Sequence, residues 1–351
     1  MSDFAKSDPV ESDPTYVYGP IPSRRLGQSL GVDLIPLKTC NWNCVYCQLG
    51  RTIPLTNERR QYVPTETVVE QVLTALETHE PGEIDFVSFV GAGEPTLHSD
   101  IGTMIRAVKA ASDIPVAVIT NGAALYLPEV RADISAADVV MPTINAGNEA
   151  LYRQIARPHP DVTFARYAEG LVAFRREFLG KLWIELMLLK GVNDSVEALR
   201  ELAMVLRAIQ PDEVHITLPT RPPSETWIEP PDEEGIMRAT AILGDIAQVV
   251  HPSSGTFDLS GHDNVIDAVI GIIKRHPMSQ EQLEEALSNW VPEQVEAALA
   301  QLAASGEARQ VERLGRLFWT AIPSHFPEQD QSDKTAPETR TSHVHRIGAT
   351  P

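Results

Sequence analysis

Short apolar runs recur along the first part of the chain, with amphipathic helical patterns between them. The runs are rich in Val, Ile and Leu and end near Gly, Asn, Asp or Pro, which is typical of buried strands. They cover residues 29–35, 85–90, 114–120, 138–144, 181–189 and 213–218. Strands that alternate with helices predict a parallel sheet with right-handed crossovers. Six such units predict an α/β fold, an open, partial (β/α)6 barrel rather than a closed barrel of eight.

Two of the segments between the runs show the helical period clearly. Residues 66–78 and 196–209 each place their apolar side chains on one stripe, which is the side that a helix buries. A hydroxyl side chain directly before a helix accepts a hydrogen bond from a free backbone N–H of the first turn. Thr65 and Ser195 are therefore predicted to be the N-caps of these two helices.

A second unit is predicted after the barrel pattern ends. Residues 265–275, 279–287 and 292–304 have amphipathic helical patterns, and residues 307–321 predict a hairpin that turns at Leu314 and Gly315. Three short helices and a hairpin form a winged-helix pattern. The predicted divisions are a flexible arm at 1–15, the partial barrel at 16–250, a linker at 251–263, a winged-helix-like domain at 264–322 and a disordered tail at 323–351.

The charge balance narrows the range of partners. The chain of 351 residues has 29 Lys and Arg against 48 Asp and Glu, a net charge of −19, whereas proteins that follow duplex phosphates present a basic face. The winged-helix segment has five Lys and Arg against eight Asp and Glu, a balance of −3, so duplex DNA is not an expected partner. No apolar run of about 18 residues is long enough to span a bilayer, and the first residues lack a secretion signal. We therefore expect a cytoplasmic protein without a membrane partner.

All three cysteines stand in one loop after the first predicted strand. Cys40, Cys44 and Cys47 have the spacing C-x3-C-x2-C, an odd and clustered set that suits a metal site in a reducing compartment better than a disulfide framework. A closed zinc site needs a fourth side chain, and the chain has no fourth cysteine. Three cysteines fit a 4Fe-4S cluster with one iron left open. Zinc with His98 or another distant histidine is the alternative.

The cysteine loop resembles that of the radical S-adenosylmethionine (SAM) superfamily, which has this spacing and an aromatic residue before the last cysteine, here Tyr46. Residues 22–27, 29–33 and the loop are similar to a branch of iron-sulfur oxidoreductases related to the tRNA wybutosine synthase. The resemblance extends roughly over residues 19–231. The synthases of that branch use additional cysteines for a second cluster, which this chain lacks, so we do not expect it to perform their condensation.

The resemblance implies an enzyme with one 4Fe-4S cluster held by the three cysteines and with SAM as its cofactor. A reduced cluster would split SAM to a 5′-deoxyadenosyl radical, and the radical would abstract hydrogen from a substrate. The expected substrate is an RNA nucleoside or a peptide, and the sequence does not choose between these two classes. An electron donor such as flavodoxin or ferredoxin is the implied partner.

The resemblance also assigns SAM contacts to the carboxyl ends of the strands, where barrel active sites are built. The glycine turn that contains Glu94 is expected to bind the methionyl amino group, and residues 142–146 resemble the pattern Ser-Leu-Asp-Ala with Asn145 in place of the carboxylate. The expected SAM contacts are Tyr46, Gly91, Gly93, Glu94, Thr120, Asn121, Thr143, Asn145 and Asn193. Arg221, after the sixth run, is expected to bind a carboxylate or phosphate of the substrate or of SAM. No catalytic residue is assigned.

Two other classes of function stay open on the residues alone. A structural protein would hold zinc or a cluster at the cysteine loop without cleaving SAM. A regulator would bind nucleic acid through the winged-helix unit, and the acidic balance of that unit counts against it.

Overall fold

A computed structural model describes residues 14–250, 264–288 and 290–322. The predicted linker and tail, and the predicted arm up to residue 13, lie outside the described residues. The described chain has two large hydrophobic cores, one between the sheet and helices of the barrel and one inside the C-terminal unit.

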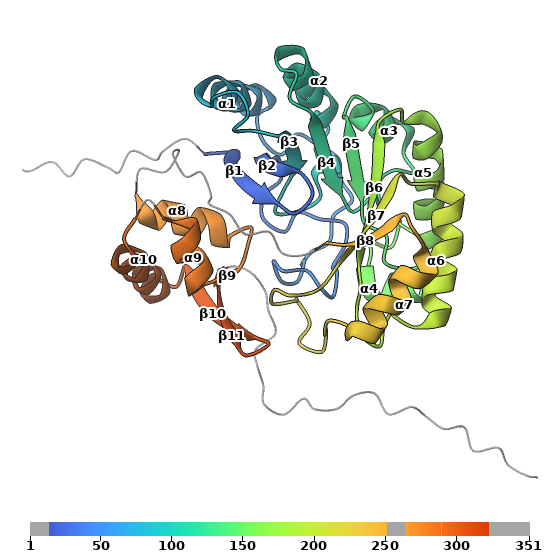
Figure 1. Cartoon of the computed structure of the whole chain (residues 1–351). Coiled ribbons are helices and arrows are strands. Elements are labelled where there is room, and N and C mark those ends of the chain that lie inside the picture. The colour runs from blue at the N-terminus through green and yellow to red at the C-terminus, as the bar shows by residue number, and fades with distance from the viewer. Residues whose placement is uncertain (1–13, 251–263, 289, 323–351) are drawn as a thin grey trace, which may run out of the picture.

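The barrel is built on one sheet of eight strands in the order of the chain (Figure 1). The strands are β1 Val17–Ser23, β2 Gly27–Asp33, β3 Phe86–Val90, β4 Val116–Thr120, β5 Val139–Pro142, β6 Lys181–Met187, β7 Glu213–Thr217 and β8 Ala247–Val249. β1 is antiparallel to β2, and every later pair is parallel. Among the described residues β1 and β8 do not pair, so the sheet is open. The six predicted strands are confirmed as β2 to β7, whereas β1 and β8 were not predicted.

Helices follow the six predicted strands in turn, which confirms the six strand-helix units. They are α1 Thr65–Thr78, α2 Ile101–Ala111, α3 Pro128–Ile134, α4 Glu149–Ala156, α5 Phe164–Glu177, α6 Val196–Ile209 and α7 Glu233–Leu243, and a short 3-10 helix, η1, covers Pro95–Leu97. Figure 1 shows α2, α3, α5, α6 and α7 along the outer side of the curved sheet. The apolar stripe of each packs on the sheet, where burial of apolar surface stabilises the layer.

One of the two predicted helix caps is confirmed. The Ser195 hydroxyl accepts a hydrogen bond from the Ala198 backbone N–H at 3.2 Å. The prediction for Thr65 is wrong: Thr65 is the first residue of α1, and its hydroxyl donates to Asp100 Oδ2 at 2.8 Å. Pro64 precedes the helix instead, and a proline needs no partner for a backbone N–H.

The C-terminal unit contains three helices and a hairpin at the predicted places. They are α8 Val265–Ile273, α9 Gln280–Ala286, α10 Pro292–Ser305, β10 Ala308–Arg313 and β11 Arg316–Ala321, and the short strand β9 Met278–Ser279 joins β11 in an antiparallel sheet. Leu314 and Gly315 both have positive φ, 49° and 73°, which matches a tight two-residue hairpin turn. The winged-helix assignment of this unit stays a prediction. No helix in the described parts of the chain is both long and apolar enough to cross a membrane.

Candidate active site

A cavity of about 410 Å³ lies on the inner side of the sheet, a size that suits a small-molecule site. Its walls come from β1 and β2, the cysteine loop, the ends of β3, β6 and β7, and two residues that follow α8. Seven of the predicted site residues line it: Cys40, Cys44, Cys47, Tyr46, Gly91, Gly93 and Arg221. Six others do not: Glu94, Thr120, Asn121, Thr143, Asn145 and Asn193.

The three cysteines are free thiols in an enclosed position. Burial raises the pKa of Cys40 to about 12 and holds that of Cys44 well above its usual range. The positive group that contacts a thiol is the Lys38 ammonium, which lies 3.1 Å from Cys47 Sγ and donates to the Gly50 carbonyl at 2.7 Å. Thiols in such surroundings become thiolates when a metal centre supplies positive charge. The donor set therefore fits a thiolate-bound cluster.

The zinc alternative depends on a fourth ligand, for which His98 is the candidate. Within the described residues, no group of three or more His, Cys, Asp or Glu side chains is gathered around one metal position. His98, the candidate fourth zinc ligand, is buried, with Nε2 3.0 Å from the Val63 carbonyl and Nδ1 3.1 Å from the Asp100 backbone N. Both of its ring nitrogens already have backbone partners.

The glycine turn after β3 packs directly on the cysteine loop. A Cβ on Gly93 would lie 2.0 Å from the Thr39 carbonyl oxygen, and a Cβ on Gly91 would lie 2.4 Å from Asp33 Oδ1. At Gly93 the obstacle is backbone, so no side chain fits without moving the cysteine loop, whereas at Gly91 the obstacle is the carboxylate of Asp33. Two backbone hydrogen bonds join the glycine turn to the cysteine loop, from Lys38 N to the Ala92 carbonyl at 2.7 Å and from Glu94 N to the Thr39 carbonyl at 2.9 Å. The turn and the cysteines thus face one cavity as a fixed unit.

Glu94 lies just behind this turn and is 1% exposed. Its Oε1 accepts from the Thr96 backbone N–H at 3.1 Å, the Thr96 hydroxyl at 2.6 Å and the Thr120 hydroxyl at 2.5 Å, and its Oε2 accepts from Asn121 N at 2.7 Å. Burial raises the pKa of Glu94, and the Thr120 and Thr96 hydrogen bonds oppose that rise. The Asn121 amide donates to Asn41 Oδ1 at 2.7 Å, which holds it against the cysteine loop. The predicted SAM contact of Glu94 stays a prediction.

Two of the predicted SAM-contact residues, Asn145 and Asn193, form a hydrogen-bonded group next to Tyr46 at the ends of β5 and β6. Asn145 donates from Nδ2 to the Tyr46 hydroxyl at 2.8 Å and accepts at Oδ1 from Met187 N at 2.7 Å. Asn193 donates to the carbonyls of Asn145 and Met187, both at 3.0 Å. Thr143 is buried, and its carbonyl accepts from the Tyr167 hydroxyl. These residues fix the strand ends behind the cavity, and their predicted roles toward SAM stay predictions.

Several residues of the cavity were missed by the sequence analysis. Arg275 and His276 come from the C-terminal unit and line the cavity beside Arg221. Nothing in their local sequence marks them, because the contact joins distant parts of the chain. Lys38 stands two residues before Cys40, and its closeness to the first cysteine was an available signal.

Comparisons with known proteins identify the family. The family model of the radical SAM superfamily matches residues 34–203. A UPF0026 protein of Methanocaldococcus jannaschii is 35% identical over 279 residues, which cover 78% of this chain and 86% of that protein. The chain belongs to the UPF0026 family of radical SAM proteins. The predicted superfamily is confirmed, and with it an enzyme that uses a 4Fe-4S cluster and SAM and needs a reductant.

Other similar proteins extend the comparison of this UPF0026 chain. A UPF0026 protein of Helicobacter pylori is 29% identical over 276 residues, 78% of this chain and 88% of that one. A Brachyspira hyodysenteriae protein named GTPase Obg is 34% identical over 301 residues, and the match spans 84% of this chain but only 43% of that protein. The solved structure of TYW1 with a lysine-pyruvate adduct bound has a TM-score of 0.47 at 15% identity, over 61% of this chain and 72% of that one.

Proposed function

We propose that Cys40, Cys44 and Cys47 hold one 4Fe-4S cluster with one iron open to SAM, and that the enzyme removes hydrogen from a substrate in the cavity. When bound, a reduced cluster would supply one electron to the sulfonium of SAM, so that the carbon-sulfur bond would break to give methionine and a 5′-deoxyadenosyl radical. One observation carries the proposal: the three thiols and the glycine turn line one cavity, and backbone hydrogen bonds of Lys38 and Thr39 join the cysteine loop to the turn.

The chain's own residues have distinct tasks in this proposal. Lys38 places a positive charge beside Cys47 and ties the loop to the Gly50 carbonyl. Gly91 and Gly93 let the turn pack closely against Asp33 and the cysteine loop, which fixes the turn beside the thiols. Glu94, Thr120 and Asn121 hold the turn from behind, and Thr143, Asn145 and Asn193 do the same for the Tyr46 side of the cavity.

The electron donor, the cellular location and the substrate class are also part of the proposal. A flavodoxin or ferredoxin supplies the electron, and three free cysteines suit the reducing cytoplasm. Names of relatives point to different substrates: an RNA methyltransferase of Synechocystis is 28% identical over 233 residues, and a GTP 3′,8-cyclase of Lactiplantibacillus plantarum is 27% identical over 161 residues. The names of these relatives therefore do not decide between an RNA nucleoside and a peptide as the substrate.

Anaerobic reconstitution tests the proposed reaction. We expect about four irons per chain, one cluster's worth, and 5′-deoxyadenosine when the reduced protein receives SAM. Cys44→Ala should lose both the cluster absorbance and the product, whereas Lys190→Gln, a change at an exposed side chain, should keep both. Formation of 5′-deoxyadenosine by Cys44→Ala at the parent rate would refute the assignment. About eight irons per chain would refute the single cluster.

A further inference from the structure

The cavity is strongly positive although the chain is acidic. Its charged lining residues are Arg24, Arg25, Lys38, Arg221 and Arg275 against one carboxylate, Glu185. Three of the five cations have a partner: Lys38 faces the Cys47 thiol, Arg25 pairs with Glu185, and Arg275 pairs with Asp33. Arg24 and Arg221 remain without a carboxylate partner among the described residues.

Two neighbouring guanidinium groups without an anion are costly to enclose, because each repels the other and loses water. Arg221 donates from Nη1 to two neutral acceptors, Gln48 Oε1 at 3.1 Å and His276 Nδ1 at 3.3 Å. Burial and the nearby charge of Arg24 lower the pKa of Arg221 to about 10, so it stays protonated at neutral pH. Arg24 makes no direct ion pair among the described residues; burial and Arg25 lower its pKa, whereas the nearby Glu185, which pairs with Arg25, attracts it. Four arginines, Arg24, Arg25, Arg221 and Arg275, thus stand against two carboxylates, Glu185 and Asp33, which leaves an excess of two positive charges.

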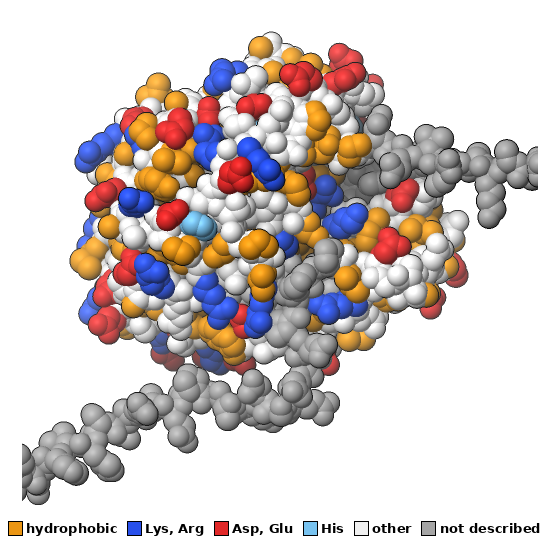
Figure 2. All heavy atoms as spheres, turned by 180° about the vertical axis from the view of Figure 1, so that it is seen from behind, with side chains coloured by type: hydrophobic (Ala, Val, Ile, Leu, Met, Phe, Trp, Pro, Cys, Tyr) orange, Lys and Arg blue, Asp and Glu red, His pale blue; other side chains and the backbone are white. Residues whose placement is uncertain are grey.

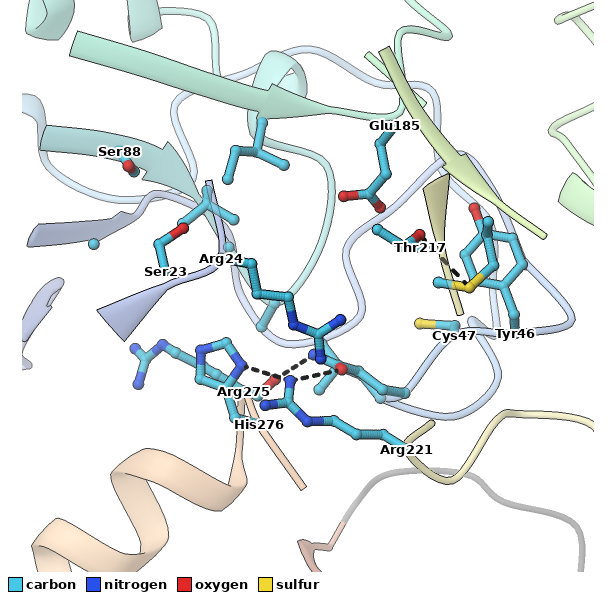
Figure 3. A pocket seen from close by; sticks show the side chains of 18 of the residues that line it. Ser23, Arg24, Tyr46, Cys47, Ser88, Glu185, Thr217, Arg221, Arg275 and His276 are labelled. Carbon is cyan, nitrogen blue, oxygen red and sulfur yellow. Dashed lines mark hydrogen bonds between the residues drawn. The ribbon is translucent and has the colours of Figure 1, made fainter. Parts of the chain in front are cut away.

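His276 of the C-terminal unit adds a donor to the same place. Because its Nδ1 accepts from Arg221, the ring carries its proton on Nε2. Nε2 is buried and has no partner among the described residues. Burial and the charges of Arg221, Arg275 and Arg24 hold the pKa of His276 well below its usual value, so the ring is a neutral N–H donor. Figure 3 shows Arg24, Arg221 and His276 converging on one side of the cavity.

We propose that Arg24, Arg221 and His276 bind the phosphate monoester group of a small-molecule substrate. An excess of two positive charges matches a phosphate monoester, which is close to doubly charged at neutral pH, better than a carboxylate or an internal phosphodiester, each with one charge. This inference rests on the proposed function for its reaction and adds the substrate class. The C-terminal unit thereby forms part of the substrate site.

The position of this subsite ties it to the cysteine loop. Gln48, the residue after Cys47, accepts from Arg221 and donates from Nε2 to the Arg275 carbonyl at 2.9 Å. A phosphate held by Arg221 is thus connected through one side chain to the loop that carries the thiols. A long nucleic acid is a poorer fit, because the net charge is −19. The face in Figure 2 intersperses acidic and basic side chains with no continuous basic field.

Calorimetric titration of the reconstituted full-length protein with inorganic phosphate tests the subsite, at about pH 8 where the probe is mostly dianionic. We expect Arg24→Gln to weaken phosphate binding by about ten to a hundredfold, from the loss of a charge-assisted contact. His276→Gln should also weaken it. Arg200→Gln, which changes an exposed arginine on α6, should bind as the parent does. Acetate, a monoanion, should bind more weakly than phosphate.

A second readout separates this role from a structural one. Arg24 is repelled by both Arg25 and Arg221 and attracted by Glu185 alone, which already pairs with Arg25. Arg24→Gln should therefore raise the Tm while it lowers phosphate affinity, as expected where function is kept at the expense of stability. Equal phosphate affinity of parent and Arg24→Gln, or no binding by the parent, overturns the proposal. Competition between phosphate and SAM, with equal loss of SAM affinity in Arg24→Gln, also overturns it, because the cations then hold the SAM carboxylate.

The remaining arm of the test concerns the size of the substrate. Salt-sensitive binding of an unphosphorylated RNA oligonucleotide, tighter than phosphate and lost in Arg24→Gln, would replace the small molecule by RNA and so overturn the proposal. These titrations do not depend on turnover. Failure of SAM cleavage would refute the proposed function and leave the phosphate result in place, and the reverse also holds.

Discussion

Arg275, in the C-terminal unit, donates from Nε to Oδ2 of Asp33, the last residue of β2, at 2.9 Å. The other oxygen of Asp33 accepts from the Ala92 backbone N–H at 3.2 Å, inside the glycine turn. The Arg275 guanidinium also lies over the Tyr18 ring, 4.5 Å from its centroid. Through these contacts the C-terminal unit touches both the edge of the sheet and the turn expected to bind SAM.

We expect Arg275→Gln to lower the free energy of unfolding by about 3–5 kcal/mol, because removing one partner leaves a buried carboxylate without its counter-charge. Asp33 is 7% exposed, so water does not replace the lost partner. Urea denaturation of the two proteins measures the difference. Arg200→Gln is the control and should stay within about 0.5 kcal/mol of the parent. Equal stability of Arg275→Gln and the parent would mean that the backbone N–H groups alone satisfy Asp33.

The stability of the fold should fall as the medium becomes acidic, partly because of His276. Its pKa is held well below its usual value in the folded chain by burial and by Arg221, Arg275 and Arg24, whereas an unfolded histidine titrates near about 6.5. Below that pH the unfolded chain binds the additional proton, so the free energy of unfolding falls as pH decreases.

Denaturation midpoints between about pH 5 and pH 7 test this pH dependence. His276→Gln should show a shallower decrease than the parent. A residual slope is expected, since burial also lowers the pKa of His98 and of His215. Parallel curves for parent and variant would show that His276 is not buried as a neutral ring.

The sequence predicts the repeated part of the fold well, because buried parallel strands leave continuous apolar runs. β1 was missed because two prolines interrupt its pattern, and proline cannot donate to a strand ladder. Its edge position, with β2 as its strand partner, tolerates them. β8 has three residues, too few to show a period.

The chemistry at the cysteine loop is local in sequence and so was predictable, whereas the walls of the cavity were not. Asp33 and Arg275 are 242 residues apart, and no periodicity relates them. Asn145 shows a different limit. Its amide both donates to Tyr46 and accepts from Met187, so an asparagine fits there for structural reasons that the family pattern does not reveal.

Glu94→Gln should weaken the glycine turn as well as SAM binding. Both carboxylate oxygens of Glu94 accept from a backbone N–H, those of Thr96 and Asn121. Glutamine can accept at one side only, so either rotamer sets an NH2 group against a backbone donor. We expect a loss of about 1–3 kcal/mol in the free energy of unfolding.

SAM affinity should also fall about ten to a hundredfold in Glu94→Gln if the carboxylate accepts from the methionyl ammonium. Glu58→Gln, at an exposed site, serves as the control. Denaturation and SAM titration on the same preparations separate the two effects. A destabilised variant with parent SAM affinity would limit Glu94 to holding the turn, and an unchanged stability would contradict the hydrogen-bond argument.

The charge of Lys38 should make the cluster easier to reduce. Its ammonium lies 3.1 Å from Cys47 Sγ, and both net charge and hydrogen bonds to the sulfurs set the potential of an iron-sulfur cluster. Lys38→Gln keeps a donor for the Gly50 carbonyl and the same left-handed backbone, where φ is 63°, but removes the positive charge. We expect the midpoint potential, measured by redox titration with paramagnetic resonance, to become more negative. Lys190→Gln should leave it unchanged, because that side chain is exposed. A Lys38→Gln potential equal to or above that of the parent would show that the ammonium does not stabilise the reduced cluster.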